Sequence, residues 1–470
     1  MIVFDLINDE APLFVAAIKS FPEFKNKTNN FVFITEGNRW KKEAEGLSCK
    51  NRLHFFDKLE SDGVNLDEEL KRISNEYDNF NIYASDRYLI QKERSFQKKF
   101  LVYTYLFFED LFSKNVTHYF TTGVAYSYNL ISFQVSKKFN VKHFSFYGIR
   151  FKNRTSVSLD QRNTFNEVLE EYKGFALHKV KAEMHEPINE FLTRPTQPNY
   201  MKNAINSSKL EFIFIKEFFI RFKRYYFSGR HRFDLFTRNP FELGTFKLKK
   251  IFNAKRINFL HKKIFDKVET EDKYFLFPLH MQPEASTLIL APFYVNQKDC
   301  IVNISKLLPL DTYLYVKEHK SALGQHSLKF YDELKTYPNI KVISYRENMF
   351  ELIRNSLGTI SLSSTVGLES LMIKKPTVLL GDVFYNDSGL TFKVDSFNEL
   401  KKVLNTVNDK SFSLDDTFEN YNEKLTFYID ALLKKSYPFE FNVAKLDTKE
   451  KVLTPNNVKE FSKCLESLIS

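Results

Sequence analysis

The chain has 470 residues, more than the ~250 to 300 that one hydrophobic core serves, so we expect two domains and a connecting region. Its hydrophobic fraction of 43% and charged fraction of 27% are those of a globular protein and argue against disorder. Cys49, Cys300 and Cys464 are too far apart for a zinc knuckle and too few for a disulfide framework, which favours a reducing compartment.

The N-terminal residues predict a first strand rather than a signal peptide. No basic group precedes the apolar residues, and Asp5, Asp9 and Glu10 lie among or directly after them. The most membrane-like stretch, residues 210–227, is interrupted by charges and falls short of the ~18 apolar residues of a membrane span. We therefore expect a cytoplasmic protein with no helix across a bilayer.

The net charge of +11 is concentrated in one segment. Between Lys216 and Lys263 there are 14 Lys/Arg and 3 Asp/Glu, and 14 − 3 = +11. Because these cations are interleaved with aromatic residues, the segment suits an anionic surface such as phospholipid headgroups, an acidic glycan or nucleic acid. A solvated helix face beside a Phe-rich core is an equally open alternative.

In the first 155 residues, short apolar runs alternate with helical patterns, which is typical of a parallel sheet with crossover helices. We predict strands at residues 2–6, 31–35, 53–56, 81–84, 116–121 and 143–147, and helices at 91–113 and 126–139. Residues 156–194 have a helical pattern. The sequence thus predicts a Rossmann-like domain over residues 1–195.

The second half repeats this organisation. Pro187, Pro195 and Pro198 indicate a linker, and residues 196–270 form the basic aromatic connecting region. Strand patterns return at residues 274–278, 312–316, 341–343, 359–362 and 377–380, which predicts a second Rossmann-like domain over residues 271–410. Residues 411–470 form a helical tail that we expect to pack back on the first lobe.

The segment after the fourth of these strands has the composition of an anion site. Ser363, Ser364, Thr365 and Gly367 stand where a strand ends and a helix containing Glu369 begins. Hydroxyls and free backbone N–H groups at a helix N-terminus attract a phosphate. Capping of the helix by a hydroxyl residue is the structural alternative.

Three blocks of sequence resemble the bacterial capsule polysaccharide synthesis family, which includes Kdo transferases. STVGLESLMIKKPTVLLGDVFY, from Ser364, is similar to the family's T-V-G-x-E-A-L segment and its G-D-x-F-Y ending. FPLHMQPEAST, from Phe277, resembles the L-H-x-Q-P-E-x-S-T segment, and YVKEHKSALG, from Tyr315, resembles the V-K-E-H-P block. The chain departs from the family at Lys320, where proline is usual, and at Lys374, where glycine is usual.

The resemblance implies a GT-B fold, that is, α/β with two Rossmann-like lobes facing a central cleft, and a donor site on the C-terminal lobe. The same position follows from the strands, because ligands of open α/β sheets bind beyond the carboxyl ends of strands. The donor-binding residues that we predict are His280, Gln282, Glu284, Ser286, Thr287, Lys317, Glu318, His319, Ser363, Ser364, Thr365, Gly367 and Glu369.

In such a site Lys317 and His319 would hydrogen-bond or neutralise the donor phosphate, and His319 is the predicted catalytic residue that stabilises the leaving nucleotide. Glu369 would accept ribose hydroxyls or fix its loop. No D-x-D stands at a strand end, so we predict no metal and no cofactor. For the base that deprotonates the acceptor hydroxyl we select Glu36, which follows a strand of the first lobe.

These observations predict a glycosyltransferase that moves a sugar from a nucleotide-sugar donor to a capsular or surface polysaccharide or a glycolipid. The resemblance suggests CMP-Kdo or a similar CMP-sugar as donor. We expect peripheral membrane contact through residues 210–263, at the inner face of the plasma membrane, and no nucleic acid partner. The alternatives are a nucleotide-sugar epimerase of the same fold and a non-catalytic partner that binds polysaccharide or nucleic acid.

Overall fold

The computed structural model describes residues 1–21, 24, 30–37, 40, 42–78, 82–162, 164–178, 191, 212–227, 229–441 and 452–470. The chain divides into two compact units. Unit 1 contains Met1–Asn166, Ile215–Pro240 and Ser436–Ser470, and unit 2 contains Glu167–Phe214 and Phe241–Lys435. The predicted linker at Pro187, Pro195 and Pro198 lies outside the described residues, so the boundary at residue 195 stays a prediction.

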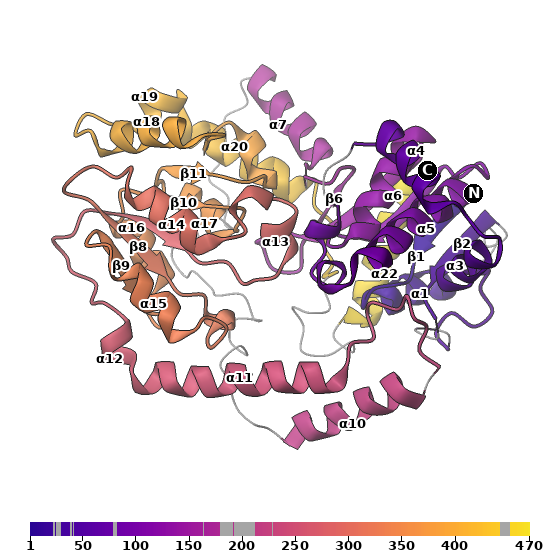
Figure 1. The fold of residues 1–470 in the computed structure, drawn as a ribbon. Coiled ribbons are helices and arrows are strands. Elements are labelled where there is room, and N and C mark those ends of the chain that lie inside the picture. The colour runs from indigo at the N-terminus through magenta and orange to yellow at the C-terminus, as the bar shows by residue number, and fades with distance from the viewer. Residues whose placement is uncertain are drawn as a thin grey trace. The chain divides into compact units, whose positions relative to one another are not determined.

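Unit 1 is built on a six-stranded sheet in the order β3-β2-β1-β4-β5-β6, in which only the edge strand β6 is antiparallel to its neighbour. Its strands are β1 (Ile2–Asp5), β2 (Phe31–Thr35), β3 (Cys49–Asn51), β4 (His118–Thr122), β5 (Lys142–Gly148) and β6 (Thr155–Ser158). Its main helices are α1 (Ala11–Ser20), α3 (Arg52–Ser61), α4 (Leu66–Glu76), α5 (Arg94–Phe112), α6 (Ser127–Lys138) and α22 (Pro455–Ile469), and α10 (Phe212–Phe227) lies mostly in this unit (Figure 1).

Two of the strands predicted in unit 1 are wrong. Residues 53–56 belong to helix α3, because Asn51 accepts a hydrogen bond from the Leu53 amide (3.0 Å) and caps the helix, so that the true third strand ends at Asn51. Residues 82–85 form the short 3-10 helix η2 (Ile82–Ser85) instead of a strand, and a second one, η3 (Leu89–Gln91), follows. Short apolar runs do not by themselves distinguish a strand from a buried helical turn.

Phenylalanine forms much of the core of unit 1. Phe4 on the central strand stacks on Phe33 and Phe120 of the strands on either side, at ring-centroid distances of 5.4 and 5.1 Å. Phe461 of the C-terminal helix α22 packs on Phe14 of α1 and on Phe146 of β5 at 5.2 and 5.4 Å. The last helix of the chain thus completes the core that the first strand begins.

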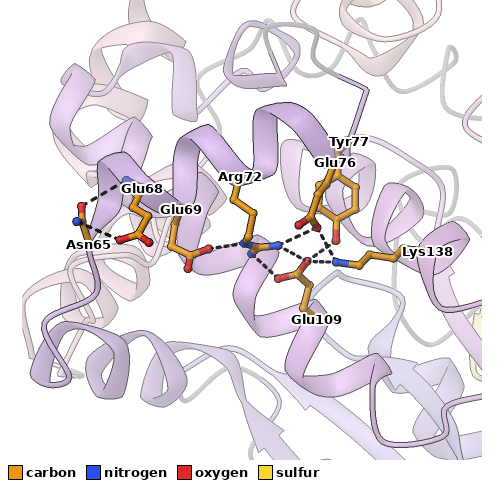
Figure 2. Close-up of polar contacts among 8 residues, drawn as sticks. All are labelled: Asn65, Glu68, Glu69, Arg72, Glu76, Tyr77, Glu109 and Lys138. Atoms are coloured by element: carbon orange, nitrogen blue, oxygen red, sulfur yellow. Dashed lines mark hydrogen bonds and ion pairs between the residues drawn. The ribbon is translucent and has the colours of Figure 1, made fainter.

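A cluster of charged residues joins three helices of unit 1 (Figure 2). Arg72 of α4 pairs with Glu76 of the same helix at 2.8 Å and with Glu109 of α5 at 2.7 Å. Lys138 of α6 reaches both carboxylates, at 2.6 and 3.0 Å, and the Tyr77 hydroxyl donates to Glu109 at 2.5 Å. Hence α4, α5 and α6 are connected by charge as well as by apolar packing.

Unit 2 contains a second six-stranded sheet, all parallel, in the order β12-β11-β10-β7-β8-β9. Its strands are β7 (Tyr274–Pro278), β8 (Tyr313–Lys317), β9 (Ile340–Ile343), β10 (Gly358–Ser361), β11 (Thr377–Leu379) and β12 (Phe392–Lys393). Its helices are α7 (Asn166–His178), α11 (Pro240–Phe259), α12 (His261–Ile264), α13 (Ala285–Leu288), α14 (Gln297–Ser305), α15 (Leu328–Leu334), α16 (Met349–Asn355), α17 (Val366–Met372), α18 (Phe397–Asn408), α19 (Leu414–Phe418) and α20 (Tyr421–Lys434), with the 3-10 turns η5 (Pro292–Tyr294), η6 (Lys320–Ala322) and η7 (Phe384–Ser388) (Figure 1).

The five strands predicted for the second half are present, and only the two-residue strand β12 was not predicted. The predicted α/β fold class with two Rossmann-like lobes is confirmed by the two sheets. Among the described residues, no helix is both long enough and apolar enough to cross a membrane.

Candidate functional site

The edge of the unit 2 sheet where its strand order reverses carries the predicted donor residues. β7 and β10 are neighbours at this edge, and the chain leaves them in opposite directions along the sheet. Ligands of doubly wound folds bind at this switch point, beyond the carboxyl ends of the strands. His280 follows β7, and Ser363 follows β10.

His280 connects the loops that follow the two strands. Its Nε2 accepts a hydrogen bond from the Ser363 amide at 3.3 Å, and Gln297 fixes its backbone through two hydrogen bonds of 2.8 and 3.0 Å. Burial lowers the pKa of His280 to about 3, and nearby His319 acts in the same direction. The imidazole is therefore neutral at pH 7, and its proton lies on Nδ1, because Nε2 is an acceptor.

The turn after β10 is tied down by its own hydroxyls. Ser363 donates through Oγ to the Ser286 carbonyl at 2.6 Å, which joins this turn to helix α13. The Ser361 hydroxyl accepts from the Ser364 amide (3.1 Å), and the Ser364 hydroxyl accepts from the Val366 amide (3.2 Å). Serine hydroxyls thus fix the turn internally, whereas Thr365, the N-cap residue of α17, makes no side-chain cap hydrogen bond.

Gly367 makes room for a tyrosine. A Cβ at this position would lie 2.1 Å from the Tyr385 hydroxyl, which donates to the Ser364 carbonyl at 2.5 Å. Glu369 is buried near the same ring, where its charge contributes to raising the pKa of Tyr385, after the larger effect of burial. Helix α17, which Thr365 precedes, has only seven residues, so the dipole at its start is that of a short helix.

Hydrogen bonds made by the Gln282 and Thr287 side chains hold the loop after β7 and the start of helix α13. Gln282, whose bond to Pro283 is cis, donates to the Val295 carbonyl at 2.5 Å. Glu284 precedes α13, and its carbonyl accepts from the hydroxyl of Thr287 (3.2 Å), which is fully buried. Thr287 thus supports the helix from inside, whereas Gln282 in the loop and Ser286 in α13 are partly exposed.

His319 follows β8, the other neighbour of β7. Its Nδ1 accepts from the Ser321 amide at 3.2 Å, so the neutral ring carries its proton on Nε2. Burial lowers the pKa of His319 to about 4; Lys317, Lys250 and His326 act in the same direction, and Glu318 acts against them. At pH 7 His319 can therefore donate a hydrogen bond to a phosphate but supplies no charge.

Glu318 is a fully engaged carboxylate beneath His319. Oε1 accepts from the His319 amide at 2.7 Å, and Oε2 accepts from His326 at 3.1 Å and from the Tyr331 hydroxyl. Although burial raises the pKa of Glu318, these hydrogen bonds hold it below its ordinary value. Glu318 thus fixes the start of the His319 turn.

Lys317 is the last residue of β8 and stands two positions before His319. Its Nζ lies 3.4 and 3.5 Å from the carbonyls of Ser344 and Tyr345, which follow β9. Burial lowers the pKa of Lys317 to about 8, while Glu318 and Glu347 favour its charged form. The lysine is mostly protonated at pH 7 and directs its charge toward β9.

In unit 1 the predicted base Glu36 follows β2 and is buried. Its Oε2 pairs with Arg52 Nη2 at 2.5 Å, and the Arg52 guanidinium lies 5.0 Å from the ring of Tyr128. A guanidinium partner favours the charged carboxylate and makes it a weaker base. Asp86, which also follows a predicted strand, accepts four hydrogen bonds, two of them from Ser127, and is structural.

Three residues that hold the carboxyl edge of the unit 2 sheet in place were not predicted: Gln297, Tyr331 and Tyr385. Each acts on a predicted residue through one or two hydrogen bonds from another element, 13 to 21 residues further along the chain. Tyr385 was within reach, because it ends the G-D-x-F-Y segment that carries the resemblance. Nothing local to Gln297 or Tyr331 distinguishes them from ordinary helix residues.

The fold and this edge define an α/β protein whose second Rossmann-like unit brings His280, Ser286 and Ser363 into direct contact, with His319 beside them. Residues 230–406 match the model of a family described as capsule polysaccharide biosynthesis protein. The three sequence blocks that resemble this family all lie inside the matched region, so the family resemblance is confirmed. Within the described residues, no three His, Cys, Asp or Glu side chains gather as a metal site.

The chain is also similar to individual proteins. It is 24% identical over 150 residues to the protein FixF of Sinorhizobium fredii, a match that covers 30% of this chain and 35% of that protein. The chain thus spans about a third of the length of this relative. Among solved structures it is similar to a β-Kdo 2,7 transferase, KpsC, of Thermosulfurimonas dismutans (13% identity, 77% and 89% of the two chains, TM-score 0.34) and to a UDP-GlcNAc 2-epimerase of Methanocaldococcus jannaschii (15%, 92% and 98%, TM-score 0.26).

Proposed function

We propose that this protein is a glycosyltransferase that binds a nucleotide-sugar at the carboxyl edge of the unit 2 sheet and transfers the sugar to a capsular or surface polysaccharide or a glycolipid. One observation carries the proposal. The switch point of a doubly wound sheet, inside the region that matches the capsule family, joins an imidazole to a serine turn and places a second imidazole nearby.

The chemistry of these groups suits a leaving nucleotide. Cleavage of the sugar–phosphate bond builds negative charge on the phosphate, which fixed hydrogen-bond donors stabilise. His319 offers Nε2–H, because its Nδ1 is occupied by the Ser321 amide. Lys317 adds a positive field from the same strand. We propose these two residues for the phosphate and the 280–287 loop for the rest of the donor.

The acceptor hydroxyl needs a base, and we retain Glu36 for this role. Its pairing with Arg52 defines a condition that the role must meet: acceptor binding has to weaken the ion pair or displace it. We propose a CMP-sugar such as CMP-Kdo as the donor on the strength of the family resemblance.

The test measures binding and turnover separately. Titration calorimetry with CMP, UDP and GDP would identify the base, and His319→Ala should reduce kcat by about 10² to 10³ in a transfer assay. Lys329→Ala, an exposed change on α15 in the same unit, is the matched control and should have wild-type activity. If His319→Ala has wild-type turnover and nucleotide affinity, the site assignment is wrong.

Two other functions give different outcomes. An epimerase would convert the donor alone into an altered sugar without any acceptor. A non-catalytic partner would bind polysaccharide or nucleic acid and release no nucleotide; for nucleic acid, its affinity would fall steeply with salt. Product analysis with and without acceptor separates the three.

We further propose that the enzyme works in the cytoplasm at the inner face of the plasma membrane, with residues 210–263 in peripheral contact with it. The support is the excess of Lys and Arg in this segment and its many aromatic residues.

A further inference from the structure

Helix α11 of unit 2 has two different faces. One face packs on the unit: Ile251, Ala254 and Ile257 are buried, and the Lys250 side chain donates to the Ser321 carbonyl at 2.8 Å. At Gly324 the turn approaches so closely that a Cβ there would lie 2.1 Å from the Lys250 carbonyl. The helix is therefore a fixed part of unit 2, attached to the turn that carries His319.

The opposite face exposes a stripe of large apolar side chains, which we call the α11 stripe: Phe241, Leu248, Phe252 and Phe259, with exposed fractions of 52%, 47%, 61% and 88%. Their spacings of 7, 4 and 7 residues fit the helical period, so all four project from one side of α11. Several large apolar side chains gathered on one exposed face indicate an interaction surface, whereas scattered ones do not.

Cations flank the stripe. Lys249, Lys255 and Arg256 are exposed on its two sides, and the Arg256 guanidinium lies 5.7 Å from the Phe252 ring. Between Pro240 and Lys263 there are seven Lys/Arg and one Glu. A second copy seated on this face would bring the same cations against each other, which costs binding energy. An anionic lipid surface instead complements the cations and accepts the apolar side chains.

We propose that the α11 stripe is a docking surface for an anionic phospholipid bilayer, with the helix lying in the plane of the interface. The four apolar side chains enter the headgroup boundary, and the flanking Lys and Arg pair with lipid phosphates. This deepens the proposed membrane location by naming the face, the side chains and the lipid charge. Because the His319 turn packs on the other side of α11, docking also fixes the donor unit beside the membrane.

The experiment is flotation of the full chain with vesicles of phosphatidylglycerol and phosphatidylethanolamine, compared with phosphatidylcholine alone. The chain should float only with the anionic vesicles, and Phe252→Ala/Phe259→Ala should weaken binding about tenfold or more. Lys249→Gln/Lys255→Gln/Arg256→Gln should also weaken it and reduce its dependence on salt. Leu310→Ala, which removes a fully exposed apolar side chain elsewhere on unit 2, is the control and should bind as the wild type.

The flotation assay contains neither sugar donor nor acceptor. Vesicle binding can therefore be absent in a protein that transfers sugar, and sugar transfer can be absent in a protein that binds vesicles. Equal flotation of the Phe252/Phe259 variant and the wild type would overturn the proposal. A dimer that dissociates in this variant, with unchanged vesicle binding, would assign the stripe to a second copy. A lower melting temperature with unchanged vesicle binding would assign it to the protein interior.

Discussion

The two units have sheets with the same succession of strands but different chemistry at the carboxyl edge. In unit 1 this edge holds carboxyl groups: Asp5 is buried, where desolvation raises its pKa, and Glu36 pairs with Arg52. In unit 2 the edge holds the neutral imidazoles of His280 and His319 and a serine turn. The shared strand order thus positions a ligand without deciding its chemistry, which depends on the loops.

This difference suits two substrates of unlike charge. Neutral donors and a nearby lysine favour a phosphate, whereas carboxylates repel one and accept hydrogen bonds from sugar hydroxyls. We therefore expect the nucleotide to bind unit 2, and the predictions below test whether the edge charges of unit 1 are structural or functional.

The largest expected effect is at the buried ion pair of unit 1. Arg52→Met should destabilise the protein by ~3 to 5 kcal/mol, because it removes the guanidinium that pairs with the buried Glu36 carboxylate. Denaturant unfolding measures this. Adding Glu36→Gln to Arg52→Met should restore part of the loss. If Arg52→Met is as stable as the wild type, the Glu36–Arg52 pair does not stabilise this edge of the sheet.

The same variants test Glu36 as the base. Removal of the guanidinium raises the carboxylate's proton affinity, so the acid limb of the transfer pH profile should move to higher pH in Arg52→Met. A purely structural Glu36 would leave the profile in place and change only stability.

The second prediction concerns the tight contact in the serine turn of unit 2. Gly367→Ala should cost ~1 to 3 kcal/mol, because the new Cβ would lie 2.1 Å from the Tyr385 hydroxyl. Tyr385→Phe removes that oxygen, so Gly367→Ala should cost less in its presence. Gly174→Ala on α7 is the control, since a Cβ there meets nothing within 4 Å and should be neutral or stabilising. Equal costs in both backgrounds would show that the hydroxyl is not the obstacle.

The sequence predicts the second unit better than the first for a physical reason. Its predicted strands are short, mostly apolar runs bounded by polar or turn residues, as in a strand buried on both faces. In unit 1, residues 53–56 have a similar apolar composition but form a helix. The Asn51 side chain accepts a hydrogen bond from the Leu53 amide and caps the start of that helix. Because phenylalanine is so common in this chain, the spacing of apolar residues does not distinguish a strand from a helix in such short runs.

The sequence predicts which loops form the candidate site, but it does not predict the role of each residue in those loops. Strand order alone brings the ends of β7, β8 and β10 together, and His280 and Ser363 meet there. The sequence could not indicate that Gly367 serves Tyr385, or that both oxygens of Glu318 are occupied by His319, His326 and Tyr331. Those pairings depend on side chains brought in by other elements.

The third prediction compares a buried histidine from each unit. His280 and His143 both have pKa values lowered by burial to about 3. Below pH 6.5 the unfolded chain takes up a proton that each folded imidazole refuses, so stability is complete above 6.5 and falls as the pH drops toward 3. Each histidine contributes a slope of up to ~1.4 kcal/mol per pH unit.

His280→Asn and His143→Asn should each flatten this slope in urea titrations at several pH values. Only His280→Asn should also weaken nucleotide binding, because only His280 contacts the serine turn. His54→Asn, an exposed change on α3, should leave both unchanged. Loss of nucleotide binding in the His143 variant would mean that the donor site extends to unit 1.

The smallest expected effect is in the charged cluster of unit 1, away from the sheet edge (Figure 2). Glu109→Gln should cost ~1 to 2 kcal/mol, because it weakens the contacts to Arg72 and Lys138 in a partly exposed setting. Although burial raises the pKa of Glu109, its hydrogen bonds hold the pKa below the ordinary value of 4.5. The contribution is therefore complete above pH 4.5 and is lost as the pH falls through the lower, folded value.

Salt distinguishes this cluster from the buried pair at the edge. Exposed charges are screened at 0.5 M salt, so the cost of Glu109→Gln should shrink there, while the cost of Arg52→Met should not. Asp67→Asn, which removes an exposed single ion pair to Lys98 on the same helical layer, is the control and should cost less than about 0.5 kcal/mol. If salt reduces the cost of Glu109→Gln and the cost of Arg52→Met by the same amount, the carboxyl edge of the unit 1 sheet is open to solvent. Its carboxylates are then available to an acceptor without rearrangement.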